Sequence, residues 1–205
     1  MTKLLIMLHG DGSNGADLAL IGQHIAQNIG ADYASPDAPY AFDQGGTGRQ
    51  WFSINGVTEA NRPDRVADAR ASFDATISEI IEAHGLQNQL HNVALVGFSQ
   101  GSIMALDAVA SGRWPVGAVV AFSLRFSSPA PLTPALQTPV LLIHGTNDPV
   151  MPVPVANHAE ATLTAAGLRT KLHLLPGVGH SITPDGIALA QDFLRENLKD
   201  DVLMA

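Results

Sequence analysis

The sequence predicts an α/β protein, with one parallel sheet covered by helices on both faces. Six short apolar runs recur along the chain, and segments of helical length lie between them. The runs are almost continuously apolar rather than alternating, which is typical of strands that are buried on both faces. Strand and helix alternate without a break in composition, as in doubly wound proteins.

The expected strands are residues 4–8, 33–35, 93–98, 116–122, 140–144 and 171–175. The expected helices are residues 15–29, 63–84, 99–110, 153–166 and 184–198. In the first helix, Leu18, Ile21, Ile25 and Ile29 recur at spacings of three and four, which places them on one face. We expect Gly85 to end the second helix, because glycine readily adopts the left-handed conformation that follows a helix C-terminus. The segment 36–62 is rich in Gly, Pro and Asp, and we expect a long loop with a functional or mobile role.

Length and composition limit the class of protein. A chain of 205 residues with 46% hydrophobic residues is expected to form one domain, residues 1–205. The formal net charge of −8 disfavours binding to nucleic acid or to an anionic membrane. The absence of cysteine excludes disulfides, thiolate metal sites and a cysteine nucleophile. The apolar run at 4–8 is too short for a signal peptide or a membrane span, so we expect a cytoplasmic protein without stable membrane insertion.

The strongest motif is Gly-Phe-Ser-Gln-Gly at residues 97–101, where a buried strand runs directly into a helix. So sharp a turn strains the backbone of the central Ser99. The turn also requires glycine at 97 and 101, because a Cβ at either position would collide with a neighbouring strand or helix. The hydroxyl of Ser99 is then exposed at the N-terminus of a helix, which favours negative charge. A serine that only caps the helix explains the same turn, so the motif needs support from elsewhere in the chain.

A serine nucleophile requires a base and an acid that orients the base. Asp148 follows the strand at 140–144, and His180 lies on a Gly-rich loop after the strand at 171–175. Both residues come after Ser99 in the order acid, then histidine, which is the order expected on this architecture. Asp148 is also placed to close an Asx-turn, and one carboxylate can do both.

The oxyanion of an acyl transfer reaction needs two N–H donors. We expect one from Gln100, the residue after Ser99, and one from Asp11 in the loop Leu-His-Gly-Asp-Gly after the first strand. A phosphate-binding loop is the rival interpretation of these glycines. It is disfavoured because the loop has no Gly-Lys-Ser/Thr motif and because an acidic residue stands where phosphate would bind.

Taken together, these motifs resemble the phospholipase/carboxylesterase family of α/β hydrolases, which includes small bacterial carboxylesterases and acyl-protein thioesterases. LHGDG, SPDAPY, GRQWFS, GFSQGS, HGTNDPVMPV and GVGHSI occur in the family's order over nearly the whole chain. The resemblance implies a reduced three-layer α/β hydrolase fold with about six parallel strands in the order 2-1-3-4-5-6. It implies Ser99 as nucleophile, His180 as base, Asp148 as acid, and Asp11 and Gln100 as oxyanion donors. The expected substrate pocket consists of Trp51, Phe52, Leu124, Val150 and Met151.

The chain departs from the family pattern near the expected site. Asp11 replaces a common leucine and adds a carboxylate at the mouth, so anionic substrates are expected to be disfavoured. Leu124 and Arg125 follow Ser123 where relatives often have Ser-Gly, so a larger side chain could narrow one wall.

The function that we expect is hydrolysis of short-to-medium carboxylic esters through an acyl-enzyme on Ser99, without a metal or an organic cofactor. An acyl thioesterase or lysophospholipase is the alternative, because the same residues can cleave those substrates. A non-catalytic binding protein of the same fold is a third reading. The expected partner is a small-molecule ester, and the chain could form a homodimer.

Overall fold

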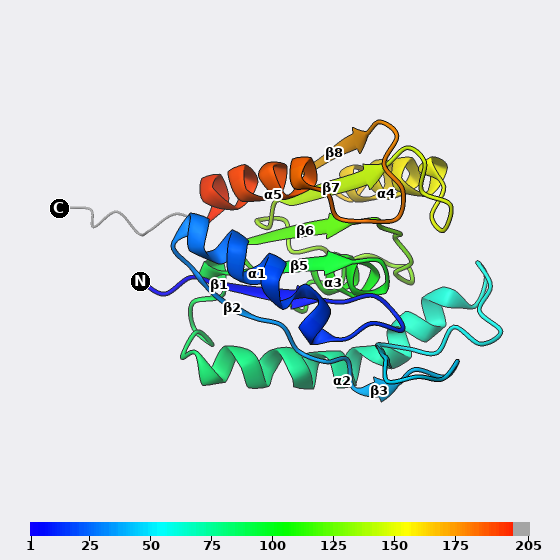
Figure 1. The fold of residues 1–205 in the computed structure, drawn as a ribbon, viewed down its shortest axis with the longest axis horizontal. Helices are drawn as coiled ribbons and strands as arrows, with labels where there is room; N and C mark the ends of the chain where they lie inside the picture. The colour runs from blue at the N-terminus through cyan, green and yellow to red at the C-terminus, as the bar shows by residue number, and fades with distance from the viewer. Residues whose placement is uncertain (199–205) are drawn as a thin grey trace.

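The computed structural model describes residues 1–198, and its centre is a six-stranded parallel sheet (Figure 1). The strands lie in the order β2-β1-β5-β6-β7-β8, which is the predicted order 2-1-3-4-5-6. Their bounds are Leu4–Leu8 for β1, Asp32–Ala34 for β2, Val93–Phe98 for β5, Ala118–Phe122 for β6, Val140–Gly145 for β7 and Thr170–Leu175 for β8. The chain thus adopts the predicted α/β hydrolase architecture.

Helices cover both faces of the sheet. Helix α1 (Gly15–Ile29) and helix α5 (Pro184–Asn197) pack side by side on one face, in front of the sheet in Figure 1. Helices α2 (Arg62–Ala83), α3 (Gln100–Ala110) and α4 (Val153–Ala165) share a second apolar cluster on the other face. Because all six strands are parallel, the loops that follow β1, β5, β7 and β8 meet at one edge of the sheet.

The observed elements match the predicted ones within two residues at their ends, and the long loop holds an element that we did not predict. Strand β6 begins two residues later than expected, and just before it the Gly117 N–H donates to the carbonyls of Val93, at the start of β5, and of Leu90. Leu90 begins a short 3₁₀ turn, η1 (Leu90–Asn92). Within 36–62, β3 (Tyr40–Ala41) and β4 (Arg49–Gln50) form a small antiparallel pair, too short to leave an alternating pattern.

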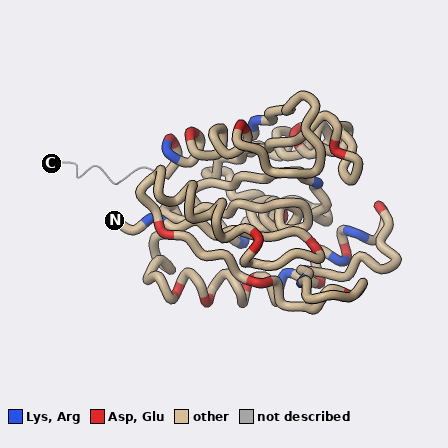
Figure 2. The backbone as a smooth tube through the Cα atoms, viewed as in Figure 1, with Lys and Arg blue, Asp and Glu red and all other residues tan. Residues whose placement is uncertain are grey.

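Charged residues lie mainly on the helices and loops, whereas the central strands β1, β5, β6 and β7 carry none (Figure 2). This distribution is expected because those strands are buried on both faces and an unpaired charge there would be costly. Among residues 1–198, no helix is long and apolar enough to cross a membrane.

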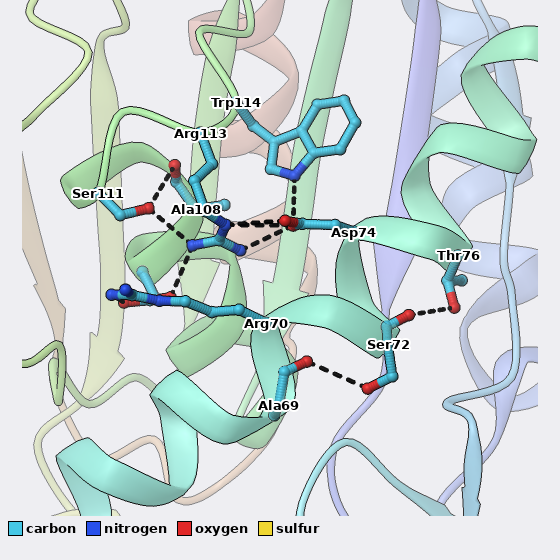
Figure 3. Close-up of polar contacts among 10 residues, drawn as sticks. Ala69, Arg70, Ser72, Asp74, Thr76, Ala108, Ser111, Arg113 and Trp114 are labelled. Carbon is cyan, nitrogen blue, oxygen red and sulfur yellow. Dashed lines mark hydrogen bonds and ion pairs between the residues drawn. The ribbon is translucent and has the colours of Figure 1, made fainter.

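A partly buried ion network joins α2 to α3 (Figure 3). The carboxylate of Asp107 is fully buried and accepts two hydrogen bonds from Arg70 and one from Arg113. Arg113 also donates to Asp74, whose carboxylate accepts a further hydrogen bond from the Trp114 indole. Burial alone would raise the pKa of Asp107, but Arg70 and the other partners hold it below its usual value. The network therefore fixes α3, the helix that begins next to Ser99.

Candidate active site

Ser99 stands at the turn between β5 and α3 in a strained backbone conformation. Its φ is 53° and its ψ is −118°, in a region that non-glycine residues rarely adopt. A Cβ on Gly97 would lie 2.6 Å from the Gly101 carbonyl oxygen, and a Cβ on Gly101 would lie 2.0 Å from the Leu8 carbonyl oxygen. Both distances are shorter than van der Waals contact, so the predicted need for glycine on each side of Ser99 is confirmed.

Ser99, His180 and Asp148 are linked by hydrogen bonds, although they come from three different loops. His180 Nδ1 lies 2.8 Å from Asp148 Oδ2, and His180 Nε2 lies 3.0 Å from Ser99 Oγ. A carboxylate only accepts, so Nδ1 carries the proton and Nε2 is free to accept from the serine hydroxyl. The ring of His180 also packs against Phe98, with 5.0 Å between ring centroids. This geometry allows Ser99 to transfer its proton to His180.

The two oxygens of Asp148 do different work. Oδ1 accepts from the N–H groups of Val150 and Met151, each at 2.8 Å, and Oδ2 faces His180. The turn-closing role and the histidine contact that the sequence suggested therefore coexist. Burial would raise the pKa of Asp148, but the hydrogen bonds from Met151, His180 and Val150 lower it overall. The carboxylate stays ionised at neutral pH and keeps the imidazole oriented.

A second histidine, His144, lies close to Asp148 but makes its hydrogen bonds to other groups. His144 Nε2 is 3.9 Å from Asp148 Oδ2, but it lies 2.6 Å from the Met151 carbonyl oxygen, to which it must donate. Its Nδ1 accepts from the Leu124 N–H at 3.2 Å. Both nitrogens are therefore satisfied in the neutral form, and His144 braces the loop that carries Asp148.

The loop after β1 passes very close to Ser99. A Cβ on Gly10 would lie 3.1 Å from the Ser99 Cβ, so the backbone of this loop runs alongside the serine. The N–H groups of Asp11 and Gln100 have no hydrogen-bond acceptor among residues 1–198, and both residues line the cavity at Ser99. Two unpaired N–H donors next to the serine are what a developing oxyanion requires.

The position of this loop depends on His9, which the sequence did not single out, and on Trp51, which we expected in the substrate pocket. His9 is fully buried; its Nε2 accepts from the Ala38 N–H at 2.9 Å, and its Nδ1 donates to the Gly10 carbonyl at 2.7 Å. Burial lowers the pKa of His9, so the ring is neutral at pH 7. The indole of Trp51 donates to the His9 carbonyl at 2.9 Å.

Gln100 ties the start of α3 to the loop above the cavity through its side chain. Its Oε1 accepts from the Trp51 N–H at 2.7 Å, and its Nε2 donates to the Phe52 carbonyl at 2.9 Å. The residue after Ser99 therefore has a second role, as a clamp, in addition to its backbone N–H. The motif Gly-x-Ser-x-Gly does not specify the residue after the serine, so this role of the Gln100 side chain could not be predicted from the motif.

A cavity of about 180 Å³ opens directly at Ser99. Of the expected pocket residues, Phe52, Val150 and Met151 line it. Trp51 and Leu124 do not, and those two expectations were wrong. Trp51 is only 1% exposed and packs edge-on against Phe73, with 5.5 Å between ring centroids, while Leu124 is fully buried. Trp51 contributes instead to a larger hollow beside the cavity, which is lined by β3, β4 and the start of α2.

Five further residues line the same cavity, and sequence reasoning did not place them there: Ile54, Val57, Arg62, Ile103 and Arg125. The sequence marked Arg125 as a departure from the family pattern, but not the charge that it brings. The expectation that Asp11 disfavours anionic substrates counted one charged residue, whereas the cavity holds Asp11 and two arginines. No group of three or more His, Asp or Glu side chains within residues 1–198 could hold a metal ion.

Known proteins resemble this chain in sequence and in fold. The sequence profile of the phospholipase/carboxylesterase family matches residues 1–198. Esterase YpfH of Escherichia coli K12 is 34% identical over 200 residues, which cover 94% of this chain and 82% of that protein. Acyl-protein thioesterase 1 of Debaryomyces hansenii is 29% identical, with 95% of this chain and 91% of that protein covered. The crystal structure of esterase PE8 superposes with a TM-score of 0.86 at 33% identity, covering 96% of this chain and 93% of that one.

Proposed function

Because this chain belongs to the phospholipase/carboxylesterase family, we propose that it hydrolyses short-chain carboxylic esters, with Ser99 as the nucleophile. The observation that carries the proposal is the continuous hydrogen-bonded path from Ser99 Oγ through His180 to Asp148, at 3.0 and 2.8 Å. The relatives named as esterases support the same reaction.

The reaction follows from the protonation states. Ser99 Oγ attacks the ester carbonyl while its proton moves to His180 Nε2, and Asp148 stabilises the imidazolium that forms. The negative charge on the carbonyl oxygen is taken up by the N–H groups of Asp11 and Gln100, each worth about 10²–10³ in rate on related sites. His180 then protonates the departing alcohol. A water molecule repeats these steps on the acyl-enzyme and releases the acid.

The size of the cavity supports a short acyl group. Its volume of about 180 Å³ lies below the range of roughly 300–1,000 Å³ that is usual for drug-sized ligands. Apolar side chains of Phe52, Ile54 and Ile103 suit a small acyl chain. A long acyl chain would have to leave this cavity or open it.

Thioester hydrolysis is the second candidate, and the similarity to an acyl-protein thioesterase favours it. The same residues would act on a thioester without rearrangement, because attack and oxyanion stabilisation are common to both acyl groups. The cavity volume favours short esters over long acyl thioesters.

The test is a chain-length series of p-nitrophenyl esters, from acetate to palmitate, run beside thioesters of the same acyl groups. We expect the largest kcat/KM for acetate to butyrate esters, labelling of Ser99 by a fluorophosphonate, and a loss of at least about a thousandfold in kcat for Ser99→Ala. A rate for Ser99→Ala within tenfold of the wild type would exclude Ser99 as the nucleophile. A preference for palmitoyl thioesters would establish the second candidate instead.

A further inference from the structure

Two arginines in the Ser99 cavity have most of their hydrogen-bonding capacity unused. The side chains of Arg62 and Arg125 are 15% and 14% exposed, and both line the cavity. Each guanidinium has five N–H donors. Within residues 1–198 each makes one hydrogen bond, and both go to the same atom, Glu59 Oε1.

The structural arginines of this protein are different. In the network that joins α2 to α3, Arg113 donates to Asp74, Asp107 and Ser111, and Arg70 forms a two-point contact with Asp107 (Figure 3). Both guanidiniums are held by two or more hydrogen bonds to carboxylates of α2 or α3, as expected where an arginine only holds helices together. Arg62 and Arg125 face a cavity instead and share one acceptor.

That acceptor is poorly fixed by its surroundings. The side chain of Glu59 is 78% exposed and has no other hydrogen-bond donor among the described residues. An ion pair with such an exposed partner contributes little, because water and salt compete for both charges. Glu59 therefore shows that a carboxylate can bind to both guanidiniums at once. The carboxylate of a ligand could displace Glu59 with only a small loss of stabilising free energy.

We propose, on the basis of the ester hydrolysis inferred above, that Arg62 and Arg125 bind a carboxylate of the substrate, so that this enzyme prefers small esters that carry a second, ionised carboxyl group. The geometry that supports this is the placement of both arginines and Ser99 around one cavity of about 180 Å³. A half-ester of a small dicarboxylic acid carries both an ester carbonyl for Ser99 and a carboxylate for the guanidiniums.

The charge balance of the cavity agrees with this assignment. Its charged lining residues are Arg62, Arg125 and Asp11, an excess of one positive charge once the exposed Glu59 has turned to solvent. A guanidinium matches a carboxylate with two parallel N–H donors, and the unused donors of Arg62 and Arg125 allow that contact. Most of the other lining residues are apolar and suit the carbon chain between the ester and the carboxylate.

The experiment compares esters that differ only in charge. Monoethyl glutarate is matched by ethyl glutaramate, in which an amide replaces the carboxylate, and O-acetyl lactate is matched by O-acetyl lactamide. The first pair places the charge in the acyl part of the ester, and the second places it in the alcohol part. The pair with the larger preference for the charged ester shows which part of the substrate the arginines bind. The measured quantity is the ratio of kcat/KM for the charged ester to that for its amide.

We expect this ratio to favour the charged ester in the wild type and to fall about tenfold in Arg125→Gln, with Arg125→Lys between the two. Glu59→Gln removes the internal competitor and should raise the ratio severalfold. Arg195→Gln is the matched control, because it removes the same charge from an exposed arginine of α5 and should leave the ratio unchanged. Equal ratios in the wild type, Arg125→Gln and Glu59→Gln would overturn the proposal.

A binding measurement separates this inference from the proposed reaction. Calorimetric titration of Ser99→Ala with glutarate should give saturable binding that weakens about tenfold on adding Arg125→Gln, and no binding of glutaramide. If neither ester series is hydrolysed by the wild type but glutarate binds in this way, the proposed reaction fails and the carboxylate site stands. If glutarate does not bind, or binds Ser99→Ala and its Arg125→Gln derivative equally, the carboxylate site fails whatever the rates.

Discussion

Replacement of Asp148 by asparagine isolates the electrostatic role of the carboxylate from its structural role. Asp148 uses Oδ1 to accept from two backbone N–H groups and Oδ2 to accept from His180. Asparagine keeps one oxygen, which the two backbone donors of the turn would hold in place. The amide NH₂ would then face His180 Nδ1. Because an NH₂ group donates, the ring must place its proton on Nε2, and it can no longer accept from Ser99.

The size of the effect follows from this change of tautomer. Loss of the correct tautomer costs about 10⁴ in kcat where the same substitution has been made in a serine hydrolase site, which corresponds to about 5 kcal/mol of the barrier. The folded state should be almost unaffected, because the turn keeps its acceptor and no volume is lost. We therefore expect kcat for p-nitrophenyl acetate to fall by about four orders of magnitude, with a melting temperature close to that of the wild type.

Asp107→Asn is the matched control for Asp148→Asn, because it should lower the stability of the protein and leave kcat nearly unchanged. Asp107 is buried and accepts hydrogen bonds from Arg70 and Arg113. None of these three residues lines the Ser99 cavity. Its two arginine partners are 28% and 20% exposed, so we expect a loss of about 2 kcal/mol of stability, or roughly 4–8 °C in melting temperature, with kcat nearly unchanged. If Asp148→Asn kept more than a tenth of the wild-type kcat, or if both variants lost activity in proportion to stability, the assignment of Asp148 would be refuted.

Three further substitutions test other parts of the site. Gly101→Ala should prevent correct folding or displace the turn, since its Cβ would lie 2.0 Å from the Leu8 carbonyl oxygen, and circular dichroism would detect this; a folded, active variant would contradict it. Gln100→Leu, which removes both hydrogen bonds of its amide to the loop above the cavity, should lower kcat/KM about tenfold with little change in overall stability. Burial lowers the pKa of His9 in the folded state, so its contribution to stability is complete above the unfolded pKa of about 6.5 and is lost as pH falls. Below that pH, the free energy of unfolding should decline by up to about 1.4 kcal/mol per pH unit. The decline should be less steep in His9→Gln, which has no imidazole to protonate.

The features that could be predicted from the sequence are those imposed by local chemistry. Each buried strand is a continuous apolar run, and the turn at Ser99 needs glycine on both sides, so both leave a readable pattern. Parallel topology then brings the ends of distant strands to one edge, which is why Asp148 and His180 could be paired with Ser99 before their distances were known.

The features that could not be predicted depend on contacts between distant segments with no pattern of their own. Trp51 was assigned to the pocket by resemblance, but its indole turns inward to reach the His9 carbonyl, and no local signal distinguishes the two orientations. Arg125 and Glu59 are 66 positions apart and meet only because the loop before α2 folds over the end of β6. A single arginine or glutamate in a loop is most often a solvated surface residue, so their pairing at the cavity has no counterpart in sequence.

The pairing of Glu59 with the arginines also determines which conditions would alter substrate selectivity. The hydrogen bond from Arg62 lowers the pKa of Glu59, and the neighbouring Arg125 adds to this despite partial burial. Glu59 therefore remains ionised throughout the neutral range, and it competes with a substrate carboxylate to the same extent at pH 6 as at pH 8. Selectivity for charged esters should thus be insensitive to pH in this range. It should decrease with salt, because ions screen the attraction between the arginines and the substrate carboxylate, whereas the neutral amide has no such attraction to lose. A selectivity that changed with pH but not with salt would point to a titrating group elsewhere in the cavity, and the arginine pair would not be its cause.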